Sequence, residues 1–353
     1  MPEPFPAVLS VLDLAPVGQG QTAGDALRAS IQLVQEAERL GYHRYWVAEH
    51  HNMPGIASSS PPVLLATLAM VTEHIRLGSG GVMLPNHAPL VVAEQFGMLE
   101  ALHPGRIDLG IGRAPGTDQV TAAALRRSLG GLREPDLTQL LGELLGFFNG
   151  TFPADHPFRQ ITAVPGRGHQ PAIWLLGSSD YSARLAGLLG LPFSFAHHFA
   201  GTNTMAAIEI YRESFQPSAV LDEPYLMLGV AATVAETTER ARYLSKPGDI
   251  GFLRLRQGRP QPYPSPEEAA AFRFTPAEAE AIKAWNRTRS VGDPATVEAD
   301  LRELVARTGA DELMVTTMVH GYEDRAASYR LLAEQVGLPG AGHGPPVTAT
   351  AAD

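Results

Sequence analysis

Two short stretches decide the fold of this chain: residues 45–51 read YWVAEHH, and residues 105–116 read GRIDLGIGRAPG. Each contains a short, mainly apolar run, which is typical of a strand that is buried on both faces of a parallel sheet. Each also ends in side chains that can bind or react, two histidines in the first and Arg113 in the second. Because a parallel barrel carries its active site at the carboxyl ends of its strands, these stretches predict both a fold and a site.

The rest of the chain alternates between strand and helix. We predict eight strands, over residues 7–12, 45–48, 75–84, 107–111, 173–176, 193–196, 225–231 and 312–317. We predict helices over residues 25–40, 61–72, 90–102, 137–148, 180–189, 203–215, 235–244, 296–308 and 323–336. Repeated strand–helix units require a parallel sheet with helices outside, so we expect an α/β protein with a closed (β/α)8 TIM barrel. An open doubly wound sheet is the alternative architecture.

One interval, 246–289, interrupts this alternation after the seventh strand. Its residues 254–264 read RLRQGRPQPYP, which is too rich in proline for regular structure. Long irregular insertions in compact domains are usually functional lids or disordered segments, and we expect a mobile lid over the barrel mouth. We therefore predict a single domain over residues 1–338 that contains this insertion, followed by a disordered tail over 339–353.

Composition narrows the class of protein. A net charge of −10 and an isoelectric point near 5.6 argue against binding to nucleic acid or to an anionic membrane surface. The chain has no cysteine, which excludes disulfides, thiolate nucleophiles and cysteine-ligated metals. The N-terminus lacks the basic and apolar regions of a signal peptide, and no apolar run is long enough to span a bilayer. A soluble cytoplasmic protein is therefore expected.

Two pairs of adjacent histidines follow strands, His50 and His51 after the second and His197 and His198 after the sixth. Adjacent residues on an extended strand point to opposite faces, so only one histidine of each pair can face the barrel mouth. For the first pair, both a site residue and a hydrogen-bonded structural residue remain open, and for the second pair the structural interpretation is favoured. Neither pair has the His-x-His or His-x-x-x-His spacing of a metal site, and we predict no bound metal.

A phosphate site is predicted from two segments at strand ends. Arg113 follows the fourth strand, and Gly177, Ser178 and Ser179 follow the fifth, directly before a helix that begins at Asp180. Glycine lets backbone N–H groups approach an anion, hydroxyls donate further hydrogen bonds, and a helix N-terminus favours negative charge. The arginine would supply a bidentate partner. The simpler interpretation of Gly-Ser-Ser is that it only caps the helix.

Gly78, Gly80 and Gly81 leave the third strand without side chains. Glycine weakens a strand unless another group approaches it closely, as a flat ring system would. A bulge or tight packing inside the barrel is the simpler interpretation of the same three residues.

Taken in order, these motifs resemble the bacterial-luciferase-like flavin monooxygenases. The resemblance rests on AEHH at 48–51, GGVMLP at 80–85, HPGR at 103–106, GIGR at 110–113 and WLLGSS at 174–179. It covers most of residues 7–336 and is strongest over 40–120. AEHH and WLLGSS are similar to the non-luminescent branch of that superfamily.

The resemblance implies a TIM barrel that binds FMN, or FMNH2 supplied by a separate NAD(P)H:flavin reductase. The reduced flavin would react with O2 to give a C4a-peroxyflavin, which oxygenates a small organic substrate. The resemblance also implies that His50 assists this chemistry, that Arg113 and the 177–179 loop hold the flavin phosphate, and that Gly80–Gly81 forms a non-prolyl cis peptide beneath the isoalloxazine. Relatives typically pair through the region of helices 61–72 and 90–102. The second of these helices is also more apolar than one core-facing stripe needs, so we expect a homodimer.

Two departures from the luciferase pattern argue against luciferase activity itself, although not against flavin binding. Luciferases proper carry a cysteine where this chain has Gly112, and a bulkier residue at the cis peptide where it has glycine. Other functions stay open: a deazaflavin (F420)-dependent dehydrogenase on the same barrel, a flavin-binding protein without turnover, or a metal-dependent barrel hydrolase. The sequence names neither the substrate nor the reductase.

Overall fold

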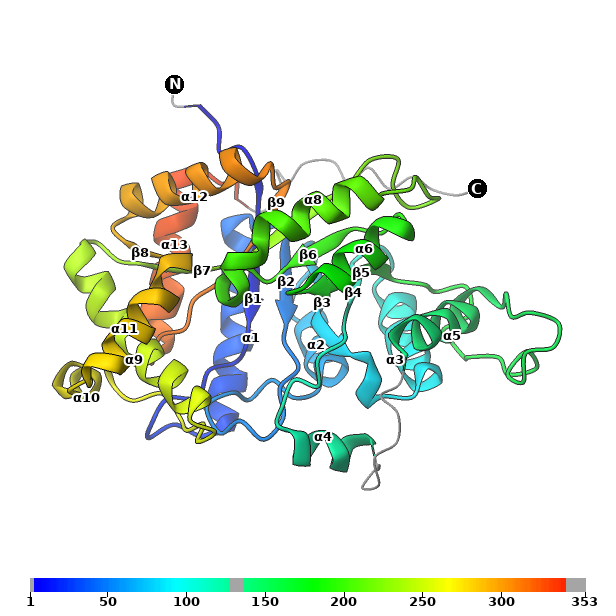
Figure 1. Ribbon diagram of the computed structural model, residues 1–353, viewed down its shortest axis with the longest axis horizontal. Helices are drawn as coiled ribbons and strands as arrows, with labels where there is room; N and C mark the ends of the chain where they lie inside the picture. The colour runs from blue at the N-terminus through cyan, green and yellow to red at the C-terminus, as the bar shows by residue number, and fades with distance from the viewer. Residues whose placement is uncertain (1–2, 127–135, 341–353) are drawn as a thin grey trace.

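The computed structural model describes residues 3–126 and 136–340 of the 353-residue chain (Figure 1). Its strands are β1 (Val8–Asp13), β2 (Arg44–Val47), β3 (Arg76–Met83), β4 (Ile107–Gly112), β5 (Ala172–Gly177), β6 (Phe193–Phe195), β7 (Leu226–Val234), β8 (Arg289–Gly292) and β9 (Glu312–Thr316). Its helices are α1 (Ala23–Leu40), α2 (Pro61–Ala69), α3 (Pro89–Leu102), α4 (Gln119–Arg126), α5 (Leu137–Asn149), α6 (Asp180–Leu188), α7 (His197–Ala200), α8 (Thr204–Ser214), α9 (Thr238–Arg256), α10 (Pro266–Ala271), α11 (Pro276–Trp285), α12 (Pro294–Thr308) and α13 (Tyr322–Val336). No helix in the described residues combines the length and apolarity that a membrane crossing requires.

Eight strands form a closed parallel barrel. Their order is β6-β5-β4-β3-β2-β1-β9-β7, and a further pairing of β6 with β7 closes the ring. All of these pairs are parallel, and the main helices pack around the outside (Figure 1). The predicted (β/α)8 TIM barrel is therefore confirmed, and the open doubly wound sheet is excluded.

Strand β8 is an addition to the eight predicted strands. Strand β7 is nine residues long, and only its residues 226–228 pair with β6. Residues 231–234 extend further along the barrel axis and pair with β8 on that side. Strand β8 thus continues the sheet where β6 has ended, at the end of the barrel to which the carboxyl termini of the strands point.

The insertion at 246–289 is more regular than its composition indicates. The helix expected to end at Leu244 continues as α9 through Pro247 to Arg256, and α10 and α11 follow. The prediction that residues 254–264 lack regular structure is wrong for 254–256, which belong to α9, and is confirmed for 257–264, which form no helix. There Tyr263 donates its N–H to the carbonyl of Val17 at 3.0 Å, which ties the segment to the loop after β1. The proposed lid role remains a prediction, and residues 341–353 of the predicted tail lie outside the described residues.

Helix α1 shows how local sequence sets an element's ends. Thr22 accepts a hydrogen bond from the N–H of Asp25 at 3.1 Å, and the Asp25 carboxylate accepts one from the N–H of Thr22 at 2.9 Å. This reciprocal cap satisfies two donors that the first helical turn leaves without partners. The helix thus begins two residues before the predicted start at Asp25. It ends as predicted at Leu40, and the next residue, Gly41, has a φ of 87° that suits a residue without a Cβ.

The middle of the barrel is filled by an apolar layer. Its members come from five strands: Leu12, Trp46, Trp174, Met227 and Met314. The rings of Trp46 and Trp174 meet edge to face with centroids 5.2 Å apart. A Cβ at Gly78 would lie 2.5 Å from Nε1 of Trp46. At this position, tight packing accounts for the glycine.

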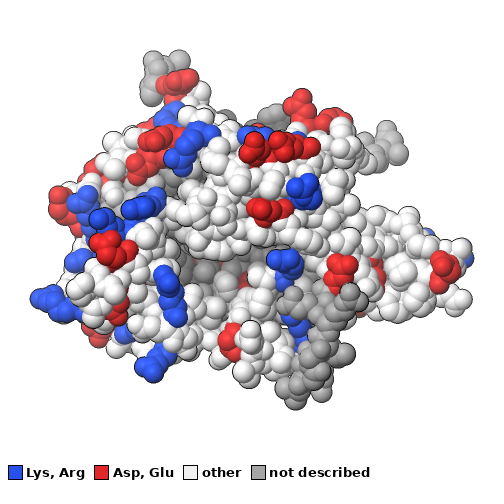
Figure 2. Space-filling view, viewed as in Figure 1, with Lys and Arg blue, Asp and Glu red and all other residues white. Residues whose placement is uncertain are grey.

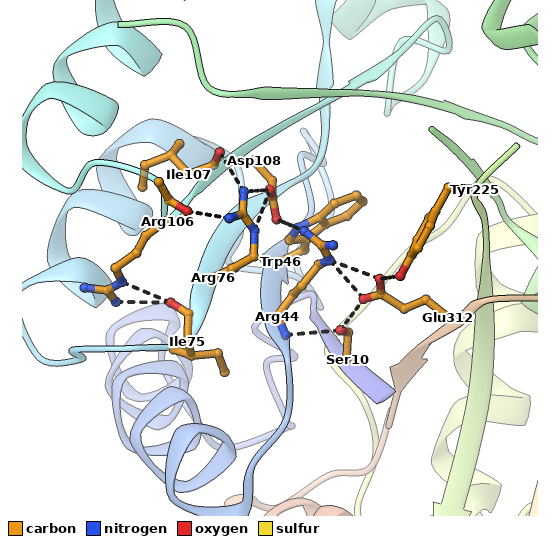
Figure 3. A network of polar contacts seen from close by, with 11 residues as sticks. Ser10, Arg44, Trp46, Ile75, Arg76, Arg106, Ile107, Asp108, Tyr225 and Glu312 are labelled. Atoms are coloured by element: carbon orange, nitrogen blue, oxygen red, sulfur yellow. Dashed lines mark hydrogen bonds and ion pairs between the residues drawn. The ribbon is translucent and has the colours of Figure 1, made fainter. Parts of the chain in front are cut away.

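Below this layer, a network of charged side chains closes the end of the barrel where the strands begin (Figure 3). Arg44 on β2 bridges Asp108 on β4 at 2.9 Å and Glu312 on β9 at 3.0 Å. Arg76 on β3 pairs with the other oxygen of Asp108 at 2.6 Å. Burial raises the pKa of Asp108, but the two arginines outweigh burial and hold that pKa below its usual value. Two buried carboxylates thus face two guanidinium groups, and no net charge is buried.

Candidate active site

A cavity of about 520 Å³ opens at the opposite end of the barrel, and its volume lies in the range of small-molecule sites. Leu12, Trp46 and Met314 of the apolar layer line its floor. Its walls come from the segments that follow β2, β4, β5 and β6. The face of the molecule in Figure 2 is hollowed near its centre, and basic and acidic side chains are interspersed over that face.

The cavity brings together most of the predicted site residues. Those that line it are His50, Gly80, Arg113, Gly177, Ser178 and Ser179. Gly81 is not part of the lining: a Cβ built on it would lie 2.7 Å from the carbonyl oxygen of Gly110 on the neighbouring strand. The peptide bond between Gly80 and Gly81 is cis, as the resemblance implies. The roles of these residues toward a cofactor remain predictions.

His50 faces the cavity, and His51 does not. Nδ1 of His50 lies 3.2 Å from the carbonyl oxygen of Gly116. A carbonyl oxygen can only accept, so in the neutral ring Nδ1 carries the hydrogen and Nε2 keeps its lone pair. Burial lowers the pKa of His50, which favours this neutral form. His51 turns instead to Glu49, with Nε2 2.9 Å from Oε1.

Glu49 is a buried anchor for the segment that carries His50, a role that no local sequence pattern indicates. Its carboxylate lies 2.9 Å from Nε2 of His51 and 2.9 Å from Nε2 of His87, and it accepts the N–H of Met83 at 3.0 Å. Burial raises the pKa of Glu49, but these hydrogen bonds leave that pKa below its usual value. Within residues 3–126 and 136–340, no group of three or more His, Asp and Glu side chains is placed to hold a metal ion.

One corner of the cavity is suited to an anion. The guanidinium of Arg113 lies over the ring of Tyr181 at 4.7 Å, and within the described residues it pairs with no carboxylate. Ser179 precedes α6 and makes no capping hydrogen bond with its side chain. The first N–H groups of α6 have no partners within the helix and carry partial positive charge. Together with the hydroxyls of Ser178 and Ser179, these groups complement a phosphate.

Gly177 lets α6 start close to the end of β5. A Cβ on Gly177 would lie 2.5 Å from Cβ of Ser182 in the first turn of the helix. Atoms this close would force the helix away from the strand. The absence of a side chain therefore keeps the N-terminus of α6 at the cavity wall.

The second pair, His197 and His198, also points in two directions. The structural interpretation that the sequence favours for both fits only one of them. His197 is buried, with Nδ1 2.7 Å from Oγ1 of Thr204, in a structural role as expected. His198 lines the cavity, with Nδ1 3.0 Å from the carbonyl oxygen of Gly229. The chain leaves the extended conformation at Phe195 and enters α7 at His197, so strand alternation does not decide which histidine faces inward.

Comparisons with known proteins identify the family. The sequence model of one protein family, the luciferase-like monooxygenases, matches residues 8–312 of this chain. A luciferase-like monooxygenase of Escherichia coli (strain K12) is 44% identical over 322 residues, which cover 91% of this chain and 95% of the relative. An N-acetyl-S-alkylcysteine monooxygenase of Bacillus subtilis (strain 168) is 36% identical over 332 residues, which cover 93% of this chain and 98% of the relative.

A solved structure gives the same result. The crystal structure of apo-MsnO8 superimposes with a TM-score of 0.86 at 39% sequence identity, and the match covers 95% of this chain and 99% of that one. Sequence and fold thus agree over nearly the whole length of the relatives. The chain belongs to the luciferase-like monooxygenases, a family of oxidoreductases.

Proposed function

We propose that this protein is a flavin-dependent monooxygenase that binds FMN in the cavity, in its reduced form FMNH2, and uses O2 to oxidise a small organic substrate. The observation that carries the proposal is the corner made by Arg113, Ser178 and Ser179, which has donors and positive charge but no carboxylate partner for the arginine among the described residues. It adjoins a largely apolar cavity. FMN has two matching parts, a phosphate and a flat aromatic ring system with broad faces that pack against apolar side chains.

The chain's own groups fit each part of that cofactor. The phosphate would accept hydrogen bonds from Arg113, the two serine hydroxyls and the first N–H groups of α6. The ring would lie against the floor formed by Trp46 and Met314, beside the bare backbone of Gly80. A cationic partner for the phosphate and an apolar bed for the ring together support FMN over a cofactor that lacks either part.

Reduced flavin, when bound, supplies the two electrons with which O2 can transfer one oxygen atom to the substrate. His50 would act as the proton acceptor through Nε2, because Gly116 holds the hydrogen of the neutral ring on Nδ1. Glu49 would position this histidine through the segment that it anchors. The apolar floor would keep bulk water away from the reacting groups.

Two partners belong to the proposal. A separate NAD(P)H:flavin reductase would supply FMNH2, and a second copy of the chain would cover α2 and α3. Large apolar side chains are exposed on or beside these helices: Val63 (67%), Met70 (77%), Val91 (45%), Met98 (53%) and Leu102 (68%). Apolar side chains gathered in this way favour burial in an interface between copies.

A titration with FMN, FMNH2, riboflavin and F420 side by side tests the cofactor. The proposal expects tighter binding of FMN than of riboflavin, and O2 consumption when FMNH2 is supplied together with a substrate. Tighter binding of F420 than of either FMN form would favour a deazaflavin-dependent dehydrogenase. Flavin binding without any O2 consumption above that of free FMNH2 would favour a flavin-binding protein without turnover.

A further inference from the structure

His198 presents a hydrogen-bond acceptor to the cavity. Its Nδ1 lies 3.0 Å from the carbonyl oxygen of Gly229 on β7, so Nδ1 must carry the hydrogen. In the neutral ring Nε2 is then unprotonated, and it has no hydrogen-bond partner within the described residues. Burial lowers the pKa of His198 to about 4, and the imidazole is therefore neutral at pH 7.

The position of this ring is fixed from several sides. A Cβ on Gly229 would lie 2.9 Å from Nδ1, so the imidazole rests directly on the backbone of β7. The ring of Phe199 meets it edge to face with centroids 4.7 Å apart. The hydroxyl of Thr288 lies 3.3 Å from the carbonyl oxygen of His198 and 3.1 Å from that of Trp285, so α7 lies against the segment before β8. The imidazole is thus held in place before any ligand arrives.

Few polar side chains surround this acceptor. Outside the arginine–serine corner (Arg113 with serines 178, 179 and 182), only His50, Ser194 and His198 contribute polar side chains to the lining formed by described residues. His50 has the same tautomer, because its Nδ1 also faces a backbone carbonyl. The cavity therefore holds two imidazole acceptors, and the rest of its lining outside the arginine–serine corner is mainly apolar. A ligand that covers an acceptor without offering a donor leaves a buried polar group without a partner, which is unfavourable.

We propose that His198 determines substrate specificity: its Nε2 accepts a hydrogen bond from an N–H or O–H group of the substrate, and the cavity therefore selects neutral substrates that carry such a donor. This inference rests on the proposed function, since it assumes that the substrate occupies the cavity. His50 and His198 then have different tasks. His50 takes a proton during the reaction, and His198 orients the molecule that is oxidised.

Matched ligand pairs that differ only in the donor test this proposal. The probes are benzyl alcohol with benzyl methyl ether, and N-benzylacetamide with its N-methyl derivative, titrated by ligand-observed NMR against the full chain with and without oxidised FMN. The wild-type protein should bind the donor-bearing member of each pair about tenfold more tightly. The ¹⁵N signal of His198 Nε2 should show an unprotonated nitrogen in the free protein, and it should shift only with the donor-bearing member.

Three variants and one control separate His198 from general effects on the cavity. His198→Phe keeps a ring but removes the acceptor, and it should bring the affinity ratio close to one. His198→Gln offers an amide oxygen and should restore part of the preference. Gly229→Ala should displace the imidazole and reduce the ratio although His198 is still present. Met83→Leu changes another lining residue at similar volume and should keep the wild-type ratio.

Several results would overturn the proposal. These are equal affinities within each pair for the wild-type protein, an unchanged ratio in both His198 variants, or no binding of any donor-bearing probe at millimolar concentration. Measuring FMN affinity on the same samples keeps the two proposals apart. A wild-type protein that binds FMN normally but shows no donor preference refutes the role of His198 alone. A wild-type protein that prefers donors but binds no FMN refutes the cofactor assignment alone.

Discussion

Replacing Arg113 with alanine should weaken FMN binding and leave riboflavin binding nearly unchanged. The guanidinium lies over Tyr181 at 4.7 Å and pairs with no carboxylate among the described residues, so its charge is available to a phosphate. Hydrogen bonds to charged groups contribute about 1.5–3 kcal/mol, and about 1.4 kcal/mol corresponds to a factor of ten in Kd. Because Arg113 is exposed to solvent, the lower end of this range applies, and Kd for FMN should rise about tenfold to thirtyfold.

Quenching of flavin fluorescence, measured with both ligands at low and high salt, provides the assay. Arg113→Lys keeps the charge but loses the planar fork, so its Kd for FMN should lie between those of wild type and Arg113→Ala. Tyr181→Phe keeps the ring beneath the guanidinium and should change little. The difference between wild type and Arg113→Ala should shrink as salt rises. An equal loss of affinity for FMN and riboflavin, or no loss for FMN, would refute the placement of the phosphate at Arg113.

Further predictions concern other parts of the molecule. His50→Ala should cut turnover about 10²–10⁴-fold with little change in stability or FMN affinity, whereas His51→Ala should lower stability more than rate. Steady-state kinetics and urea unfolding measure the two effects, and exchanged phenotypes would show that the assignment of the two histidines is wrong. Since burial lowers the pKa of His50, the acidic limb of the pH–rate profile should lie below pH 6.5, and a limb above that value would contradict a buried neutral base. The pKa of Glu49 is lowered in the folded protein, so its contribution to stability should be present above about pH 4.5 and lost as pH falls through the folded pKa. Glu49→Gln should remove this pH dependence in unfolding experiments. The same pH profile in wild type and variant would contradict a stabilising role of the Glu49 carboxylate. Met70→Glu should turn a dimer into a monomer by light scattering, and a monomeric wild type at micromolar concentration would exclude the interface on α2 and α3.

The barrel could be predicted from the sequence because buried parallel strands leave continuous apolar runs between amphipathic helices. Strand β8 could not be found in this way. It has four residues, RSVG, and pairs only with the part of β7 that extends beyond β6. The predicted helix over residues 235–244 ends too early: α9 continues through Pro247 to Arg256, although proline removes a backbone donor. Proline is a helix-stop signal of local sequence, and tertiary packing can override it.

The candidate site could likewise be predicted only in part from the sequence. Arg113 and Ser179 could be found because chain order alone places them at strand ends, where a parallel barrel gathers its ligand-binding groups. Which member of a histidine pair turns inward depends on the backbone after the strand. At His198 that backbone is already helical, so the rule of alternating faces gives no answer. Glu49 acts through side chains distant in sequence, such as His87, and no local pattern reveals those contacts.

The ionic network at the bottom of the barrel has a kinetic consequence. Arg44, Asp108 and Glu312 are at most 8% exposed, and together with the apolar layer above them they close the barrel beneath the cavity, so ligands enter and leave at the end where the strands finish. A molecule bound near the opening of the cavity obstructs the exit of any molecule bound beneath it. Ligands should therefore bind in a fixed order, and the last ligand to bind should dissociate first. A product that stays bound near the opening would then inhibit the next cycle without competing for the contacts made deeper in the cavity.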